Sequence, residues 1–417
     1  MRERAWAARF CSGLAALYMV GTIAVAGQIA LPEIDRLTAE AEQLWVQGRA
    51  EQALQTFERA VTRVRELGER GREWRLLDRM GRIYLELDQF KAALKSFQQA
   101  LRVALDQGDR SAQVVQLVAI GEVFGLLQEY QSAITTYEAL LSLEEERQDY
   151  HGQWRAYYGL GFVYKASDNP IDAIPYMERA LALARTLQDP TLELATLQEL
   201  AADMTGIGDY GRLAQYSEEI MRLARQTDNH ALAAEQLGTL GYAHEQMGNF
   251  LRAATQYQAA LQAYRELKDT SGEWQTLLDL GRVASKQQQS KQAVSYFREA
   301  LGSAQRAGSH KGQVLALEQT GEAYRRAKDY SQAIRYLQQA FKLAKEKRLR
   351  EYERVMLGAI GGVYDEMGNR KGAVAHYEQA LILARQLGDK DAERELRNKL
   401  AQAGKPSGTH EKPARKR

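Results

Sequence analysis

The sequence is poor in the residues of disulfide-stabilised, metal-binding or β-rich proteins. It has one cysteine, six prolines and six histidines among 417 residues. A single cysteine excludes an intramolecular disulfide and every cysteine-rich zinc site. The low proline content, together with many Ala, Leu, Gln, Glu and Arg residues, favours helices over strands. The composition therefore predicts a helical protein that is stabilised by packing alone.

Motifs of catalysis and cofactor binding are also missing. The sequence has no Gly-x-Ser-x-Gly motif, no protein-kinase motifs and no Cys/His spacing for a metal. "HEQMG" at 244–248 lacks the second histidine of a zinc-protease helix, and "GIGDYG" at 206–211 lacks the Lys-Ser/Thr ending of a phosphate-binding loop. The sequence predicts no enzyme, no metal site and no cofactor.

A surplus of charge of one sign is absent as well. The chain has 56 basic and 54 acidic residues, which gives a formal net charge of +2. Proteins that bind nucleic acids non-specifically usually carry a strong basic surplus. We therefore expect no nucleic-acid partner.

The first 31 residues differ in kind from the rest. Arg2, Arg4 and Arg9 precede residues 11–31, which carry no charge. This order is typical of a secretory signal peptide over residues 1–26, with Ala24-Val25-Ala26 before the cleavage point. We expect export to the periplasm or an equivalent lumen. The alternative is an uncleaved membrane anchor formed by residues 11–31, and a membrane partner is expected only in that case.

The remainder of the chain repeats with a period of forty residues. A frame that starts at residue 31 fits nine repeats through residue 390 without an insertion or deletion. Position 11 of the repeats reads Ala41, Gly81, Gly121, Gly161, Ala201, Gly241, Gly281, Gly321 and Gly361. Position 23 reads Ala53, Ala93, Ala133, Ala173, Leu213, Ala253, Ala293, Ala333 and Ala373.

Each repeat has the apolar spacing of two amphipathic helices. In the second repeat Leu77, Met80, Gly81 and Tyr84 follow the i, i+3, i+4, i+7 rule, and the same spacing returns after a short turn. Glycine at position 11 and alanine at position 23 let the two helices approach closely. A larger residue there should cost about 1–3 kcal/mol through overpacking. The recurring small residues thus predict a stacked helical hairpin.

The order of these residues resembles the tetratricopeptide repeat. In the fourth repeat the matching residues are Leu160, Gly161, Tyr164, Ala173 and Ala180. The family's usual period is 34, and its terminal proline is absent here, so this chain is similar to a longer-helix variant. The resemblance implies a right-handed α-solenoid of helix-turn-helix hairpins over residues 31–390. Residues 391–403 are expected to form a capping helix, and residues 404–417 a basic, disordered tail.

The resemblance also implies a concave groove that is lined by the first helix of each repeat. The candidate partner-binding residues are Arg75, Arg82, Arg155, Tyr158, Phe162, Tyr242 and Arg282. The Lys and Asn residues with which some relatives bind a peptide's C-terminal carboxylate are absent. Each candidate could instead be an exposed side chain without a partner.

We expect an exported, non-enzymatic scaffold or adaptor that binds a protein segment or peptide in this groove. Two alternatives stay open. The first is a peptide-gated regulatory sensor, and the second is a membrane-anchored assembly factor.

Overall fold

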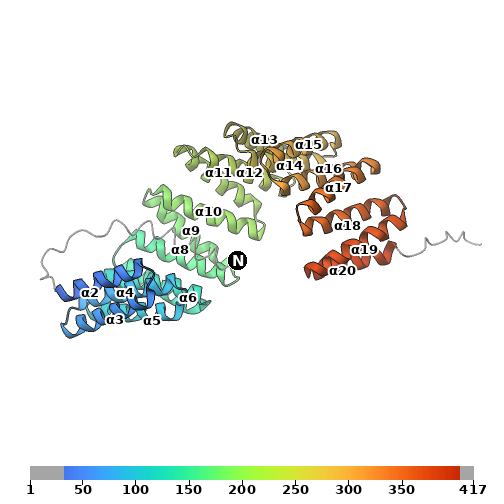
Figure 1. Cartoon of the computed structure of the whole chain (residues 1–417). Coiled ribbons are helices and arrows are strands. Elements are labelled where there is room, and N and C mark those ends of the chain that lie inside the picture. Colours follow the sequence, from blue (N-terminus) through green and yellow to red (C-terminus); the bar gives the residue numbers. More distant parts are fainter. Residues whose placement is uncertain (1–31, 404–417) are drawn as a thin grey trace, which may run out of the picture. The chain divides into compact units, whose positions relative to one another are not determined.

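The computed structural model describes residues 32–403, and all its regular structure is helical (Figure 1). Nineteen helices follow one another in that range without a strand, which confirms the prediction of an α-solenoid of helical hairpins. The first nine helices are α2 (Pro32–Val46), α3 (Ala50–Glu66), α4 (Arg70–Glu86), α5 (Phe90–Asp106), α6 (Arg110–Leu126), α7 (Tyr130–Glu146), α8 (Tyr150–Ala166), α9 (Pro170–Thr186) and α10 (Pro190–Ile207). The other ten are α11 (Tyr210–Gln226), α12 (His230–Gln246), α13 (Phe250–Glu266), α14 (Thr270–Lys286), α15 (Ser290–Arg306), α16 (His310–Arg326), α17 (Tyr330–Glu346), α18 (Arg350–Glu366), α19 (Arg370–Leu387) and α20 (Lys390–Ala403).

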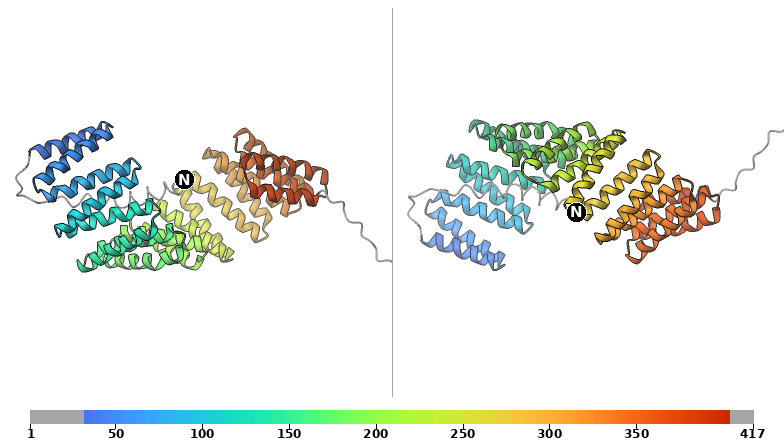
Figure 2. Two further views of the ribbon diagram at one scale, coloured as in Figure 1. Left: turned by 90° about the horizontal axis from the view of Figure 1, so that it is seen from below. Right: turned by 90° about the horizontal axis from the view of Figure 1, so that it is seen from above.

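The helices form two compact units, which meet in the sequence between Ile207 and Gly208. The division falls inside the fifth repeat, at the "GIGDYG" segment. Within each unit every helix packs against the helix before it and the helix after it (Figure 2). The core is therefore built from contacts between neighbours in the sequence. The predicted signal segment and the predicted basic tail lie outside the described residues.

Short turns of one design connect all the helices. One residue of each turn has a left-handed backbone conformation, as at Asp88 with φ 56° and Gly108 with φ 66°. After α4 the amide of Asp88 donates to the Leu85 carbonyl at 3.0 Å, and the amide of Gln89 donates to the Tyr84 carbonyl at 2.8 Å. These two bonds satisfy the last carbonyls of the helix. The same backbone conformation recurs every twenty residues, so successive repeats have the same number of residues.

The last residue of a turn also caps the next helix. Asp109 accepts a hydrogen bond from the Ala112 amide at 3.0 Å, and Asp149 accepts one from the Gly152 amide at 3.0 Å. A side-chain acceptor at this point satisfies one of the free amides of the first helical turn, and a carboxylate also favours the positive end of the helix dipole. The aspartates of the sequence's turns therefore help to fix where helices begin.

The glycine at position 11 lies beneath a side chain from the second helix of its own repeat. A Cβ atom built on Gly81 would lie 2.5 Å from the ring of Phe97, and one on Gly241 would lie 2.6 Å from the ring of Tyr257. The same relation joins Gly121 to Tyr137, Gly161 to Met177, Gly281 to Phe297, Gly321 to Leu337 and Gly361 to Tyr377. The glycine thus makes room for a ring or a long side chain of the second helix. This contact is the close approach of the two helices that the sequence predicts.

The alanines at position 23 lie at the same interface. Ala93, Ala133, Ala173, Ala253, Ala293, Ala333 and Ala373 are all fully buried. A longer side chain at these points would have no space, because protein interiors are packed as densely as organic crystals.

Candidate protein-binding surface

The first helix of each repeat, here called helix A, forms the surface on which binding is expected. The A helices of the N-terminal unit are α2, α4, α6, α8 and α10, and those of the C-terminal unit are α12, α14, α16 and α18. Successive A helices touch one another, as α6 touches α8 and α14 touches α16. We call the surface formed by their side chains in each unit the A-face. The seven predicted partner-binding residues all lie on A helices: Arg75 and Arg82 on α4, Arg155, Tyr158 and Phe162 on α8, Tyr242 on α12, and Arg282 on α14.

The two arginines of α4 have different surroundings. Arg75 is exposed, and its guanidinium lies 5.3 Å from the ring centre of Trp74. Arg82 is half-buried and donates to Asp78, with 2.7 Å between Nε and Oδ2. Asp78 also accepts a hydrogen bond from Gln116 of α6 at 3.1 Å. Arg82 is therefore part of a polar link between two A helices, whereas Arg75 is available to a partner.

Three aromatic side chains follow one another along α8. The rings of Trp154 and Tyr158 are stacked with 4.8 Å between their centres, and the rings of Tyr158 and Phe162 are tilted with 5.4 Å between their centres. The indole of Trp154 donates a hydrogen bond to Thr196 of α10 at 3.1 Å. Tyr158 is half-buried, so part of its ring remains accessible.

Phe162 corrects the sequence prediction. Its side chain is only 7% exposed, so the expectation that it presents a ring to the groove is wrong. The reason is its place in the repeat. Position 12 faces the neighbouring A helix, as Arg282 shows by contacting Glu245 of the preceding repeat. Phe162 therefore belongs to the packing of the A-face.

A carboxylate lies between two of the predicted arginines. Burial raises the pKa of Glu122 on α6 to about 7, although the charges of Arg82 and Arg155 favour its ionised form. Arg155 is half-buried, and its Nε atom has no acceptor among the described residues. Three successive A helices thus place an arginine, a glutamate and an arginine near one another.

The sequence interpretation missed the lysine that links α8 to α10. The Nζ atom of Lys165 lies 3.0 Å from Glu199 and 2.6 Å from Asp203. Asp203 is 3% exposed, and burial raises its pKa while the lysine opposes that shift. The sequence held a signal for this contact, because Lys165 and Glu199 have opposite charges and are 34 residues apart, close to the length of one repeat.

The A-face of the C-terminal unit contains a stronger link. Arg282 of α14 donates two hydrogen bonds to Glu245 of α12, each 2.7 Å long. Lys286 lies 2.9 Å from the same carboxylate, and the hydroxyl of Tyr257 donates to it at 3.1 Å. Burial opposes ionisation of Glu245, but the bonds from Arg282 and Lys286 outweigh it and lower the pKa of this carboxyl. Arg282 is therefore committed to an internal contact.

Tyr242, the other candidate in this unit, has an aromatic neighbour. Its ring meets the ring of Tyr210 of α11 edge to face, with 5.8 Å between the centres. Both side chains are half-buried. Tyr242 therefore keeps an accessible part that a partner can contact.

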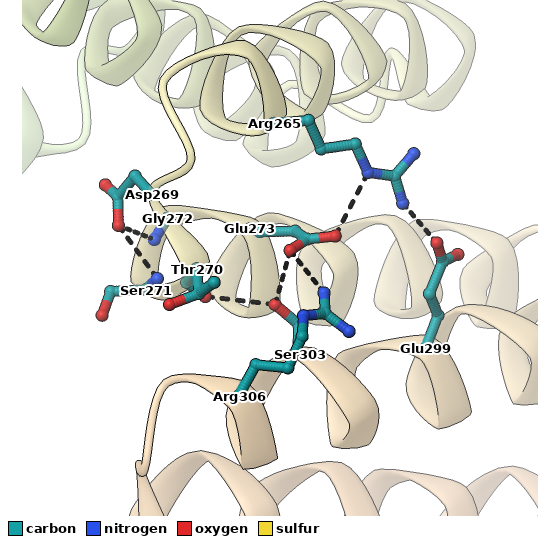
Figure 3. A network of polar contacts seen from close by, with 9 residues as sticks. All are labelled: Arg265, Asp269, Thr270, Ser271, Gly272, Glu273, Glu299, Ser303 and Arg306. Carbon is teal, nitrogen blue, oxygen red and sulfur yellow. Dashed lines mark hydrogen bonds and ion pairs between the residues drawn. The ribbon is translucent and has the colours of Figure 1, made fainter.

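A second polar network joins successive repeats near the turn between α13 and α14 (Figure 3). Glu273 at the start of α14 accepts hydrogen bonds from Arg265 at 3.2 Å, Ser303 at 2.8 Å and Arg306 at 2.7 Å. Arg265 also contacts Glu299 of α15. The carboxylate of Glu273 is 10% exposed, so its three donors replace the water that burial removes.

The contact between Arg265 and Glu273 recurs in other repeats. An arginine near the end of the second helix contacts a glutamate in the first turn of the next helix A, eight residues on. The equivalent pairs are Arg65 with Glu73, Arg185 with Glu193, and Arg385 with Glu393. The spacing shows in the sequence, and these residues connect repeats rather than form a site.

The A-face is hollow over α18. A cavity of about 520 Å³ lies there between α16, α18, α19 and α20. We call its uncharged lining residues Val355, Gly358, Ala359, Gly362 and Leu396 the floor. We call its charged lining residues the rim: Glu322, Arg325, Arg354, Asp365, Glu366, Glu395 and Lys399. The sequence prediction did not single out this place.

The described residues contain no arrangement that would suit catalysis at a metal. Between residues 32 and 403, no group of three or more His, Cys, Asp and Glu side chains is placed to hold a metal ion. Over the same range no helix has both the length and the apolar character that a membrane span requires.

Comparison with known families gives matches in both units. Profiles described as tetratricopeptide repeat match residues 36–106, 155–187, 275–346 and 357–391. Together these ranges include just over half of the sequence. A comparison with curated proteins gives no match.

Several solved structures are similar in fold. One is a signal transduction ATPase with numerous domains (STAND) with a tetratricopeptide repeat sensor, from Pyrococcus horikoshii. The match has a TM-score of 0.51 at 12% identity and covers 88% of this chain and 55% of that chain. The apo form of the quorum sensor NprR from B. thuringiensis matches with a TM-score of 0.44 at 15% identity, over 84% of this chain and 98% of that chain. The apo form of RapI matches with a TM-score of 0.45 at 17% identity, over 70% of this chain and 99% of that chain.

Proposed function

Because this chain belongs to the tetratricopeptide repeat family, we propose that it is a non-enzymatic scaffold that binds a segment of another protein on its A-face. The observation that carries the proposal is the half-buried ring of Tyr158, which lies on α8 in the same region as Arg155. Tyrosine and arginine are the residue types that most often dominate the energy of protein interfaces. The stacked ring of Trp154 holds Tyr158 in place, so little entropy is lost when a partner binds.

The A-face suits a protein segment better than a small charged ligand. Most of its charged groups already have internal partners, as the contacts of Lys165 and Arg282 show. A partner therefore gains from apolar and aromatic contacts, with Arg75 and the accessible part of Tyr158 as anchors in the N-terminal unit, or the accessible part of Tyr242 as an anchor in the C-terminal unit.

The test of this proposal is a binding measurement with a matched substitution. A partner is first identified by affinity capture with the purified chain, and its dissociation constant is then measured by calorimetry. Tyr158→Ala should weaken binding by about 2 kcal/mol, the loss of an aromatic anchor. Tyr150→Ala, on the same helix at a side chain that is 50% exposed near the turn, should leave the affinity unchanged. Equal affinities for the wild type and Tyr158→Ala would place the binding surface elsewhere.

The second candidate function is a peptide-gated regulatory sensor. In such a sensor a bound peptide changes the pitch of the solenoid. Small-angle neutron scattering of the chain, alone and with the captured partner in a deuterated form whose contrast is matched, distinguishes the two candidates because it reports the radius of gyration of this chain only. A changed radius of gyration supports the sensor, and an unchanged one supports the scaffold.

We also propose that the protein is exported. The support is the order of Arg2, Arg4 and Arg9 before the uncharged residues 11–31, with Ala24-Val25-Ala26 at the expected cleavage point. N-terminal sequencing of the protein from cells provides the test. A first residue at Gly27 supports export and cleavage. A start at Met1 in the membrane fraction supports a membrane-anchored assembly factor instead, and a start at Met1 in the cytosol contradicts both.

A further inference from the structure

The hollow over α18 arises because two successive A-face positions of the ninth repeat have no side chain. Gly358 and Gly362 stand at positions 8 and 12. Position 12 carries a large side chain, such as Arg282 or Glu322, in most other repeats. The absence of side chains at both positions exposes the backbone of α18 on the floor of the cavity.

These two glycines are not required by packing. A Cβ atom on Gly358 would meet only Leu396 at 3.9 Å, and one on Gly362 would meet only the hydroxyl of Tyr377 at 3.7 Å. Both distances are ordinary contacts, in contrast to 2.7 Å between a Cβ on Gly361 and the Tyr377 ring. Each glycine costs the helix about 1 kcal/mol relative to alanine. The fold gains nothing for this cost, which indicates that the open space has another use.

The rim of the hollow carries unbalanced negative charge. The cations are paired: Arg325 with Glu322 and Glu366, Arg354 with Asp389, and Lys399 with Glu395. The side chain of Asp365, which lines the hollow, forms no hydrogen bond or ion pair with any described residue. The carboxylate of Asp365 is thus left to interact with a cationic group that enters the hollow.

We propose that the hollow binds the C-terminal segment of this same chain, residues 404–417. That segment reads "GKPSGTHEKPARKR" and has five basic residues and one acidic residue. It directly follows α20, whose Leu396 and Lys399 line the hollow. Ala403 lies four positions after Lys399 on the helix, a rise of about 6 Å. Fourteen extended residues span up to about 45 Å, so the segment has ample length to turn back.

The chemistry of the hollow fits an extended basic segment. The exposed backbone at Gly358 and Gly362 allows a second backbone to approach closely. Asp365 then accepts a hydrogen bond from a lysine or arginine side chain, and such a bond is stronger than one between neutral groups. A bound tail covers the A-face of the last repeats and competes with any other ligand there. This inference goes beyond the proposed scaffold function and stands or falls without it.

The test uses two full-length chains. One is the wild type, and the other carries Lys405→Gln, Lys412→Gln, Arg415→Gln, Lys416→Gln and Arg417→Gln. A fluorescein-labelled synthetic peptide of residues 404–417 is titrated with each chain, and its anisotropy is measured. We expect the peptide to bind the substituted chain at least about tenfold more tightly, because a tethered tail acts at an effective concentration near the millimolar range. Equal binding to both chains would overturn the proposal.

Substitutions in the hollow are then made in the tail-substituted chain. Asp365→Asn should weaken peptide binding at least about fivefold, and Gly358→Leu should weaken it by filling the space. Glu378→Gln, at an exposed carboxylate on α19 outside the hollow, is the control for charge alone. A loss of the same size in Glu378→Gln would show non-specific attraction and overturn the proposal. A wild-type dimer that the tail substitutions dissociate, seen by light scattering, would place the tail on a second copy and overturn it as well.

Discussion

Arg282 of α14 donates two hydrogen bonds to Glu245 of α12, and each bond is 2.7 Å long. The glutamate side chain is fully buried, whereas the arginine side chain is 42% exposed. A residue that the sequence places on the binding groove thus holds two repeats together. Similar links at Asp78 and Lys165 show that polar contacts between A helices are a general feature of this fold.

Loss of the arginine should destabilise the middle of the C-terminal unit. Arg282→Met leaves Glu245 buried with fewer donors, which should cost about 2 kcal/mol. Because contacts in a repeat array connect only neighbours, hydrogen exchange should accelerate in α12–α14 before it does so in α18–α20. Arg298→Met, at an exposed arginine of α15, is the matched control and should have little effect. If both variants behave alike, the link contributes nothing to stability.

Two glycines on α12 should respond in opposite ways to alanine. Gly241→Ala places a Cβ 2.6 Å from the ring of Tyr257, and should cost about 1–3 kcal/mol through overpacking. Gly238 has no atom within 4 Å of such a Cβ, so Gly238→Ala should gain about 0.5–1 kcal/mol from helix propensity. Thermal unfolding followed by circular dichroism measures both changes. Two changes of the same sign would contradict the packing role of position 11.

The left-handed turn residues give a second pair of opposite effects. Gly108 has a φ of 66° with open space around it, and Gly108→Ala should cost about 1–2 kcal/mol because of backbone strain alone. Gln148 holds the equivalent place with a φ of 54°. There Gln148→Gly relieves the strain, but it also makes the unfolded chain more flexible, so the expected gain is at most about 1 kcal/mol. Urea unfolding of the two variants against the wild type measures the difference. A gain in Gly108→Ala would refute the argument.

The unfolding free energy should depend on pH through Glu122. Burial raises the pKa of Glu122 to about 7 in the folded state, from an ordinary value of 4.5. Between these two values the folded chain binds more protons than the unfolded chain, so stability falls as the pH rises from about 4.5 to 7. Glu122→Gln stays neutral at every pH. It should be about 1–2 kcal/mol more stable than the wild type at pH 8 and similar to it near pH 4.5.

Urea midpoints at pH 5 and pH 8 measure this difference. Glu145→Gln, at an exposed glutamate of α7, provides the control and should follow the wild type at both pH values. A Glu122→Gln variant that loses stability at pH 8 would show that its contacts with Arg82 and Arg155 outweigh its burial.

The local architecture was readable in the sequence. The glycine at position 11 and the alanine at position 23 recur at a fixed spacing, and each acts through residues nearby in the chain. Gly81 and Phe97 belong to one hairpin, and Asp109 caps the helix that it precedes. Because the glycine contacts recur in seven of the nine repeats, a periodic sequence is enough to predict them.

The environment of each A-face residue was decided only by the tertiary structure. Position 12 carries Arg82, Phe162 and Arg282 in three repeats, and the sequence treats them alike as groove residues. The structure binds Arg82 to Asp78 in its own helix and Arg282 to Glu245 of the preceding repeat, and it buries Phe162 beside Tyr158. The hollow at Gly358 likewise depends on helices α16 and α20 on either side. These outcomes depend on which side chain faces each position from a neighbouring helix, and the repeat pattern does not specify that.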